Sequence, residues 1–256
     1  EGINAAARAS ARAMAPLLYR RVTDVKPAVR KAALAALESL CTSAGHATRE
    51  DIAALSACRS DSLVSVRRQA AASLGAMCAC LPNDPALARA VAETVLPLAA
   101  DPEAQVADKA ADVCEQVFLA PLVTGDASAA EEVASTLGAL ADAPSAMAAL
   151  PRALGALHAR KAVKPAHVRA LQACCAKGTR TSARAGALAL LAQLADCAPG
   201  AVSAEFITAQ WKSLDASSSV EEDSSMADVL RIIAKCGASA LSADAGGQMT
   251  ATLAGR

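Results

Sequence analysis

The amino-acid sequence predicts an all-α fold, and three observations favour it. Hydrophobic residues make up 54% of the 256 residues, whereas aromatic residues make up only 2%. Alanine supplies much of the apolar total, and it has the highest helix propensity of any residue. The residue types that favour strands are sparse. One helical pattern also recurs along the chain, which predicts a fold built from repeated helical units.

Three copies of this pattern follow one another in the first half of the chain. Each copy has an aspartate, a valine five residues later and then an apolar stripe at helical spacing. The aspartates are Asp24, Asp61 and Asp101, which lie 37 and 40 residues apart. A period near 40 with two helices per unit is typical of HEAT-type solenoids, in which neighbouring hairpins stack and share one core. The stripes are Ala33, Leu34, Leu37 and Leu40; Ala70, Ala71, Leu74 and Met77; and Ala110, Ala111, Cys114 and Val117.

The clearest repeats are expected over 4–40, 48–80 and 85–120. The first begins with a helix over 4–22. In the second, Thr48 with Asp51 three residues later is close to a capping box. In the third, Asp84 followed by Pro85 is a strong helix-start signal, because proline has no N–H to leave unbonded.

Residues 126–236 are expected to form more divergent helical repeats, and residues 237–256 a tail. A fourth, weaker copy of the pattern begins at Gly178 without an aspartate. The serine-rich, acidic stretch 213–225 is expected to be a loop. We expect one solenoid over 1–256, as a piece of a longer soluble protein. Its later helices are expected near 128–142, 144–160, 165–177, 180–196, 203–214 and 225–236.

An arginine follows two of the repeat aspartates by six residues, as Asp24 with Arg30 and Asp61 with Arg67. The aspartate should lie in the turn before the second helix, where a carboxylate can cap backbone N–H groups. The arginine should reach the aspartate of its own or of the neighbouring repeat through a bidentate bond. We therefore expect Asp24, Arg30, Asp61, Arg67 and Asp101 to form a ladder between repeats. Ala107 stands where the third arginine would be.

Further basic residues lie close to this ladder, and they form a candidate contact surface for the DNA backbone. Helix N-termini together with lysine and arginine suit phosphate oxygens. The formal net charge of zero argues against a strongly basic nucleic-acid module, so any DNA contact would be local and independent of base sequence. The candidate residues are Arg20, Arg21, Lys26, Lys31 and Arg68.

Other functions find little support in the sequence. The three histidines are isolated from Cys and Asp at ligand spacing, so we expect no metal site. There is no Gly-x-Ser-x-Gly and no phosphate-binding loop, so we expect no catalytic residue, no cofactor and no small-molecule substrate. The nine cysteines have no CxxC pair and most lie among apolar residues, so we interpret most of them as free, buried thiols in a reducing compartment. No apolar run is long enough to suggest membrane insertion.

Two stretches, Leu17–Leu40 and Ala57–Leu74, resemble the HEAT-repeat D-type subunit of the condensin II complex, and the likeness continues over Val95–Leu122. That family shows a Leu-Leu-x-Arg-Arg run, an aspartate and Val-Arg-Lys, then a Cys-Arg-Asp type turn and Ser-Val-Arg-x-Gln-Ala. The matching residues here are Leu17, Leu18, Arg20, Arg21, Asp24, Val29 to Lys31, Cys58, Arg59, Asp61, Ser65 to Arg67, Gln69 and Ala70. The third segment departs from the pattern at Ala107 and Asp108.

The resemblance implies a non-catalytic scaffold subunit in the nucleus and on mitotic chromosomes. Its partners would be a kleisin subunit and the structural-maintenance-of-chromosomes ATPases of condensin II, with possible sequence-independent contact to DNA during chromosome condensation. The alternative is a HEAT-repeat adaptor of a transport or phosphatase assembly, with protein partners only. Both readings predict a long open groove and no deep pocket.

Overall fold

Helices stack in antiparallel pairs in this computed structural model, which describes residues 10–82, 84–124, 126–176, 179–197, 199–215 and 222–240. Within these ranges no residue forms a strand, so the all-α prediction is confirmed. By their contacts the residues group into two compact units, 1–120 with 140–159 and 121–139 with 160–256, and each is described by itself.

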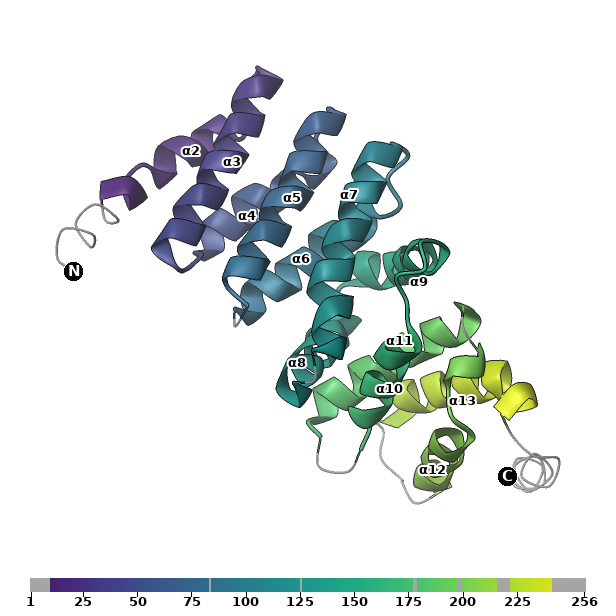
Figure 1. Cartoon of the computed structure of the whole chain (residues 1–256). Helices are drawn as coiled ribbons and strands as arrows, with labels where there is room; N and C mark the ends of the chain where they lie inside the picture. The colour runs from purple at the N-terminus through teal and green to yellow at the C-terminus, as the bar shows by residue number, and fades with distance from the viewer. Residues whose placement is uncertain are drawn as a thin grey trace. The chain divides into compact units, whose positions relative to one another are not determined.

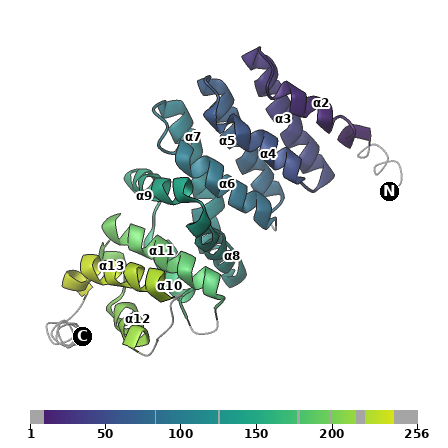
Figure 2. The ribbon, with the colours of Figure 1, turned by 180° about the vertical axis from the view of Figure 1, so that it is seen from behind.

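In the first unit, three helical hairpins stack side by side (Figures 1 and 2). The first helices of the pairs, α2, α4 and α6, pack on one another in one layer, and the second helices, α3, α5 and α7, form the other layer. Helix α9 packs on the third hairpin, against α6 and α7. The helices of this unit are α2 (Ala15–Arg21), α3 (Pro27–Ala44), α4 (Arg49–Ala57), α5 (Val64–Cys80), α6 (Pro85–Leu98), α7 (Ala104–Cys114) and α9 (Pro144–Ala159).

The helix-start signals predicted from the sequence form hydrogen-bonded N-caps at two of these helices. Thr48 and Asp51 form a reciprocal capping box at the start of α4. Asp84 accepts a hydrogen bond from the backbone N–H of Leu87 at 3.0 Å at the start of α6. Both caps satisfy N–H groups that have no partner inside the helix.

The predicted first helix is interrupted. Residues 10–12 are helical, a turn follows at Ala13 and Met14, and α2 then begins at Ala15 with Pro16 in its first turn. A proline has no N–H to donate and disfavours helical geometry in the residue before it, so a helix cannot run through this point undisturbed. Residues 4–9 of the prediction lie outside the described residues.

The apolar stripes of the three repeats form the core between the layers. Most of their predicted members are buried, including Leu34, Leu74 and Cys114, each at most 1% exposed. Leu40 and Val117, the last members of their stripes, are only half-buried, and in the third repeat α7 continues into a π-helical turn, Glu115–Leu119. A π turn holds more residues than an α turn, so the stripe shifts and Phe118 becomes the buried residue.

The second unit is arranged around one central helix, α11. Its two long neighbours are α8 and α13, with α10 also against it, and α12 packs on α13. The fourth copy of the pattern forms α11, and its predicted core residues Leu188, Leu191 and Leu194 are at most 1% exposed. The helices of this unit are α8 (Ala127–Gly138), α10 (Pro165–Ala173), α11 (Thr181–Cys197), α12 (Ala204–Asp215) and α13 (Glu222–Ala240).

The helix positions predicted for 126–236 agree with these helices within a few residues, apart from the stretch 213–225. The loop predicted there is shorter, because α12 extends to Asp215 and α13 begins at Glu222, and residues 216–221 lie outside the described residues. The pairing of the helices does not follow chain order, since α8 packs mainly on α11.

Candidate protein-binding surface

The corners between the two helices of each hairpin are built alike in the three repeats. The carboxylates of Asp24, Asp61 and Asp101 each accept the backbone N–H two residues later, at 2.9, 2.9 and 3.0 Å. The carboxylates thus cap the turn before the helix, and not the first turn inside it. The three aspartates therefore occupy equivalent positions.

Arginines connect each corner to the next. Arg30 donates from Nε and Nη2 to the two carboxylate oxygens of Asp61, at 2.6 and 2.7 Å. Arg67 makes the same two bonds to Asp101, at 2.7 and 2.9 Å. Both side chains of each pair are about nine-tenths removed from water. Each arginine reaches the aspartate of the following repeat, which fixes the spacing of α3, α5 and α7.

The third nitrogen of each guanidinium binds the arginine's own corner. Arg30 Nη1 donates to the carbonyl oxygen of Asp24 at 2.9 Å, and Arg67 Nη1 donates to that of Asp61 at 2.8 Å. One arginine therefore satisfies the backbone of one turn and the carboxylate of the next. This arrangement fits the planar fork of arginine and would not suit lysine.

The electrostatics of the corners follow from these bonds. Burial is the largest single influence on Asp61 and disfavours its charged form, but the Arg30 bond, the backbone N–H of Leu63 and the charges of Arg30 and Arg67 together outweigh burial and lower the pKa of Asp61 below its usual value. The Arg67 bond is the main reason that the pKa of Asp101 is also lowered. Both carboxylates are ionised at neutral pH, so Arg30–Asp61 and Arg67–Asp101 are ion pairs under these conditions.

A shallow polar groove lies between α5 and α7. Its volume is about 370 Å³. Arg68 reaches across it from α5, and its Nη1 lies 3.3 Å from Oε1 of Gln105 on α7. The charged lining is balanced, with two bases and two acids. The lining residues are Arg68, Gln69, Ala72, Gln105, Asp108, Lys109 and Asp112.

The five bases proposed from sequence as DNA contacts are all exposed. Arg20, Arg21, Lys26 and Lys31 lie around the turn between α2 and α3, and Arg21 donates to Asp24 at 3.0 Å. Arg68 lies apart from them on α5, at the position equivalent to Lys31, and shares its groove with Asp108 and Asp112. The structure thus gathers four of the five at one corner.

Asp51 has a role that sequence reasoning missed. Its side chain is fully buried, and it accepts bonds from Tyr19 Oη at 2.8 Å, from Thr48 at 2.8 Å and from the guanidinium of Arg12. These bonds outweigh burial and lower the pKa of Asp51. The capping-box spacing predicted the Thr48 bond, but no local pattern predicted Arg12 and Tyr19, which lie more than 30 residues away in the chain.

The described cysteines and histidines form no cluster of metal ligands. Among the described residues, no group of three His, Cys, Asp or Glu side chains could hold a metal ion. Burial raises the pKa of Cys41 to about 11 and those of Cys114 and Cys175 to about 12, so these thiols stay protonated. His167 is buried and accepts the backbone N–H of Lys164 at 3.0 Å, at the start of α10. No helix in the described part of the chain is long and apolar enough to cross a bilayer.

Stacked hairpins joined by an Arg–Asp ladder define the class: this is a helical-repeat protein of the α-solenoid type. No family model matches the chain, and no curated protein does.

Solved structures that resemble it include an engineered protein from the Northeast Structural Genomics Consortium, with 16% identity and a TM-score of 0.37 over 88% of this chain and 97% of that one. A chain from a study of the cadherin and β-catenin interaction has 16% identity and a TM-score of 0.34, over 88% of this chain and 52% of that one. A designed armadillo repeat protein has 14% identity and a TM-score of 0.31, over 86% of this chain and 99% of that one. Similarity at this level supports no functional assignment, and the fold class rests on the helix packing described above.

Proposed function

We propose that this chain is a non-catalytic scaffold that binds an extended protein segment along the α3–α5–α7 face. The observation that carries the proposal is the ladder, which holds α3, α5 and α7 in one register and leaves a polar groove between α5 and α7. A rigid face of this kind offers spaced contacts at little cost in ordering the protein itself.

The particular assembly we propose is condensin II, with its kleisin subunit as the bound segment and its structural-maintenance-of-chromosomes ATPases as further partners. The nucleus and mitotic chromosomes would be its location. The support is the resemblance of residues 17–40, 57–74 and 95–122 to the D-type HEAT subunit, since these stretches belong to the three ladder-forming repeats.

Co-purification of the full chain with the condensin II kleisin tests this proposal. Making the balanced groove acidic with Gln69→Glu and Lys109→Glu should abolish capture of the kleisin, because both residues line the groove. The matched control is Arg169→Glu, an exposed residue of α10, which should leave capture unchanged. If wild-type chain captures no kleisin, the assignment to condensin II is wrong.

We also propose a weak DNA-backbone contact at Arg20, Arg21, Lys26 and Lys31, supported by their exposure around one turn. Binding to a random duplex should weaken steeply with salt. Arg20→Glu with Arg21→Glu should reduce the slope of log K against log salt by about 2, because each phosphate contact contributes roughly 0.9. An unchanged slope would remove DNA from the proposal.

A second candidate is an adaptor that binds proteins only, as in transport or phosphatase assemblies. The balanced charge of the α5–α7 groove favours it, since Asp108 and Asp112 lie beside Arg68 and Lys109 and would repel phosphates there. Failure to capture the kleisin, together with no measurable DNA affinity at low salt, would favour this second candidate.

A further inference from the structure

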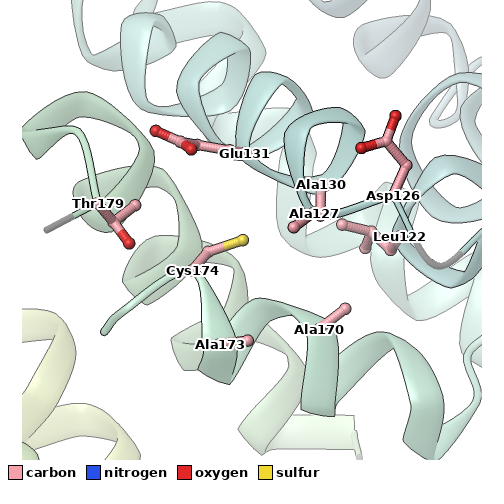
Figure 3. Close-up of a pocket in the computed structure, with 9 residues that line it drawn as sticks. All are labelled: Leu122, Asp126, Ala127, Ala130, Glu131, Ala170, Ala173, Cys174 and Thr179. Atoms are coloured by element: carbon pink, nitrogen blue, oxygen red, sulfur yellow. The ribbon is translucent and has the colours of Figure 1, made fainter. Parts of the chain in front are cut away.

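A second hollow lies in the other unit, between the start of α8 and the end of α10 (Figure 3). Its volume is about 230 Å³, below the range of about 300–1,000 Å³ usual for small-molecule sites. A space of this size suits one side chain of a partner. The lining residues are Leu122, Asp126, Ala127, Ala130, Glu131, Ala170, Ala173, Cys174 and Thr179.

Small side chains create this pocket. Ala127 and Ala130 on α8 face Ala170 and Ala173 on α10, and methyl groups are too short to fill the space between the two helices (Figure 3). Cys174 directs its sulfur into the space from the α10 side (Figure 3). Burial is the main reason that the pKa of this thiol is raised, so it presents a neutral, apolar surface.

The described lining of the pocket is acidic. Among the described residues that line it, the two charged ones are Asp126 and Glu131. Asp126 is exposed and accepts the backbone N–H of Ser128 at 2.9 Å. Glu131 accepts from Arg180 at 2.7 Å, but Arg180 also binds Glu132 at 2.8 Å, so one guanidinium serves two carboxylates.

The helix ends add to this preference. The carboxyl end of α10 lies at the pocket through Ala173 and Cys174, and a helix C-terminus carries partial negative charge. The N-terminus of α8 lies there too, but the Asp126 carboxylate already caps it. A cation beside the pocket is therefore favoured and an anion is disfavoured.

We propose that this pocket binds one apolar side chain, such as leucine, of a partner protein segment in which a lysine or arginine lies next to it. The apolar side chain would pack against the alanines and Cys174, and the neighbouring base would meet Asp126 and Glu131. This site is separate from the α3–α5–α7 face and does not depend on the proposed function.

The test uses the full chain with ¹³C-labelled alanine methyl groups and three short glycine–serine peptides. One carries a leucine between two lysines, one a leucine between two glutamates and one an alanine between two lysines. The lysine-flanked leucine peptide should shift the methyl signals of Ala127, Ala130, Ala170 and Ala173 in a saturable manner. The other two peptides should bind at least tenfold more weakly, because each lacks one of the two interactions.

Variants separate the two parts of the site. Asp126→Asn with Glu131→Gln should weaken binding roughly fivefold by removing the charge, and asparagine still caps α8. Glu132→Gln, which removes a charge that does not line the pocket, should have no effect. Ala127→Leu with Ala173→Leu fills the pocket from two exposed positions and should abolish binding, whereas Ala176→Leu should not.

The proposal is overturned if the lysine-flanked and glutamate-flanked peptides bind alike, if the shifted methyl signals lie outside the pocket or if none shifts. Loss of kleisin capture would bear only on the α3–α5–α7 face, so the two proposals can fail separately.

Discussion

Arg30 and Arg67 each connect two turns of the chain that lie more than 30 residues apart. Each arginine binds the carboxylate of the following corner with two nitrogens and a carbonyl oxygen of its own corner with the third. Because the ion pairs are largely removed from water, neither partner can be lost without leaving the other buried and uncompensated.

Asp61→Asn should therefore destabilise the first unit by about 2–4 kcal/mol, since Arg30 would lose its charged partner. Asp24→Asn is the matched control. Asp24 has the same place in its own corner, but its ion pair is to Arg21, whose side chain is 65% exposed, so the loss should be clearly smaller than that of Asp61→Asn. Urea unfolding of the two variants measures both values, and equal losses would contradict a structural role for the ladder.

The corners should also make stability depend on pH. The pKa values of Asp51, Asp61 and Asp101 are lowered below the ordinary aspartate value of 3.8. A carboxylate with a lowered pKa contributes stability that is complete above the pKa of the unfolded chain and is lost as pH falls through the folded value. The free energy of unfolding should thus be level near neutral pH and fall below about pH 4. Acid titration followed by circular dichroism checks this, and Asp101→Asn should flatten the fall.

At the scale of helices, α8 and α11 cross so closely that their backbones are in contact. A Cβ at Gly186 would collide with the carbonyl oxygen of Ala134 and lie 2.5 Å from the backbone nitrogen of Gly138. A Cβ at Gly138 would meet the carbonyl oxygen of Ser182. Ser135 and Ser182 add a hydrogen bond of 2.9 Å beside the crossing. Glycine is required at both positions by packing, whatever its helix propensity.

Gly186→Ala should destabilise the second unit by about 2–3 kcal/mol, because backbone atoms would have to move apart. Helix propensity alone predicts the opposite sign, a gain of about 1 kcal/mol. Gly155→Ala is the control, since a Cβ there meets nothing within 4 Å, and it should stabilise α9 by up to about 1 kcal/mol. Thermal unfolding of both variants decides between packing and propensity.

Much of the helix layout could be predicted from sequence, and the reasons are local. Thr48 and Asp84 are N-cap residues that predict the starts of α4 and α6. The helical spacing of the apolar residues predicts which face of α3 and α5 is buried. The packing of α8 on α11 could not be predicted, because alanine-rich helices look alike and the decisive glycines act only when another backbone approaches. The pocket between α8 and α10 could not be predicted for the same reason. It exists because the alanines that line it are too small to fill the space between the two helices.

At the scale of the whole chain, the contacts group the residues into two units. The ladder lies in the first unit, and the Gly138–Gly186 crossing lies in the second. Local opening energies differ between such cooperative groups of residues.

Hydrogen exchange should report this division. Asp61→Asn should speed exchange in α3, α5 and α7 and leave α11 unchanged, whereas Gly186→Ala should speed exchange in α8 and α11 and leave α5 unchanged. Exchange that accelerates across all helices in both variants would show that the chain opens as one unit. Mass spectrometry of peptic fragments resolves the two patterns.

The ladder has a polarity along the chain. Both arginines, Arg30 and Arg67, bind the aspartate of the repeat that follows in the chain. An arginine of a further hairpin stacked before α2 could therefore bind the Asp24 carboxylate. It would replace only the exposed Arg21, which binds Asp24 now. At the other end of the ladder, the third repeat has Ala107 where the arginine would be, so it could not bind an aspartate of a further repeat in the same way. A repeat with an arginine at the position equivalent to Arg30 should consequently extend the ladder when it is appended before α2, through an ion pair to Asp24, and not when it is appended after the third repeat.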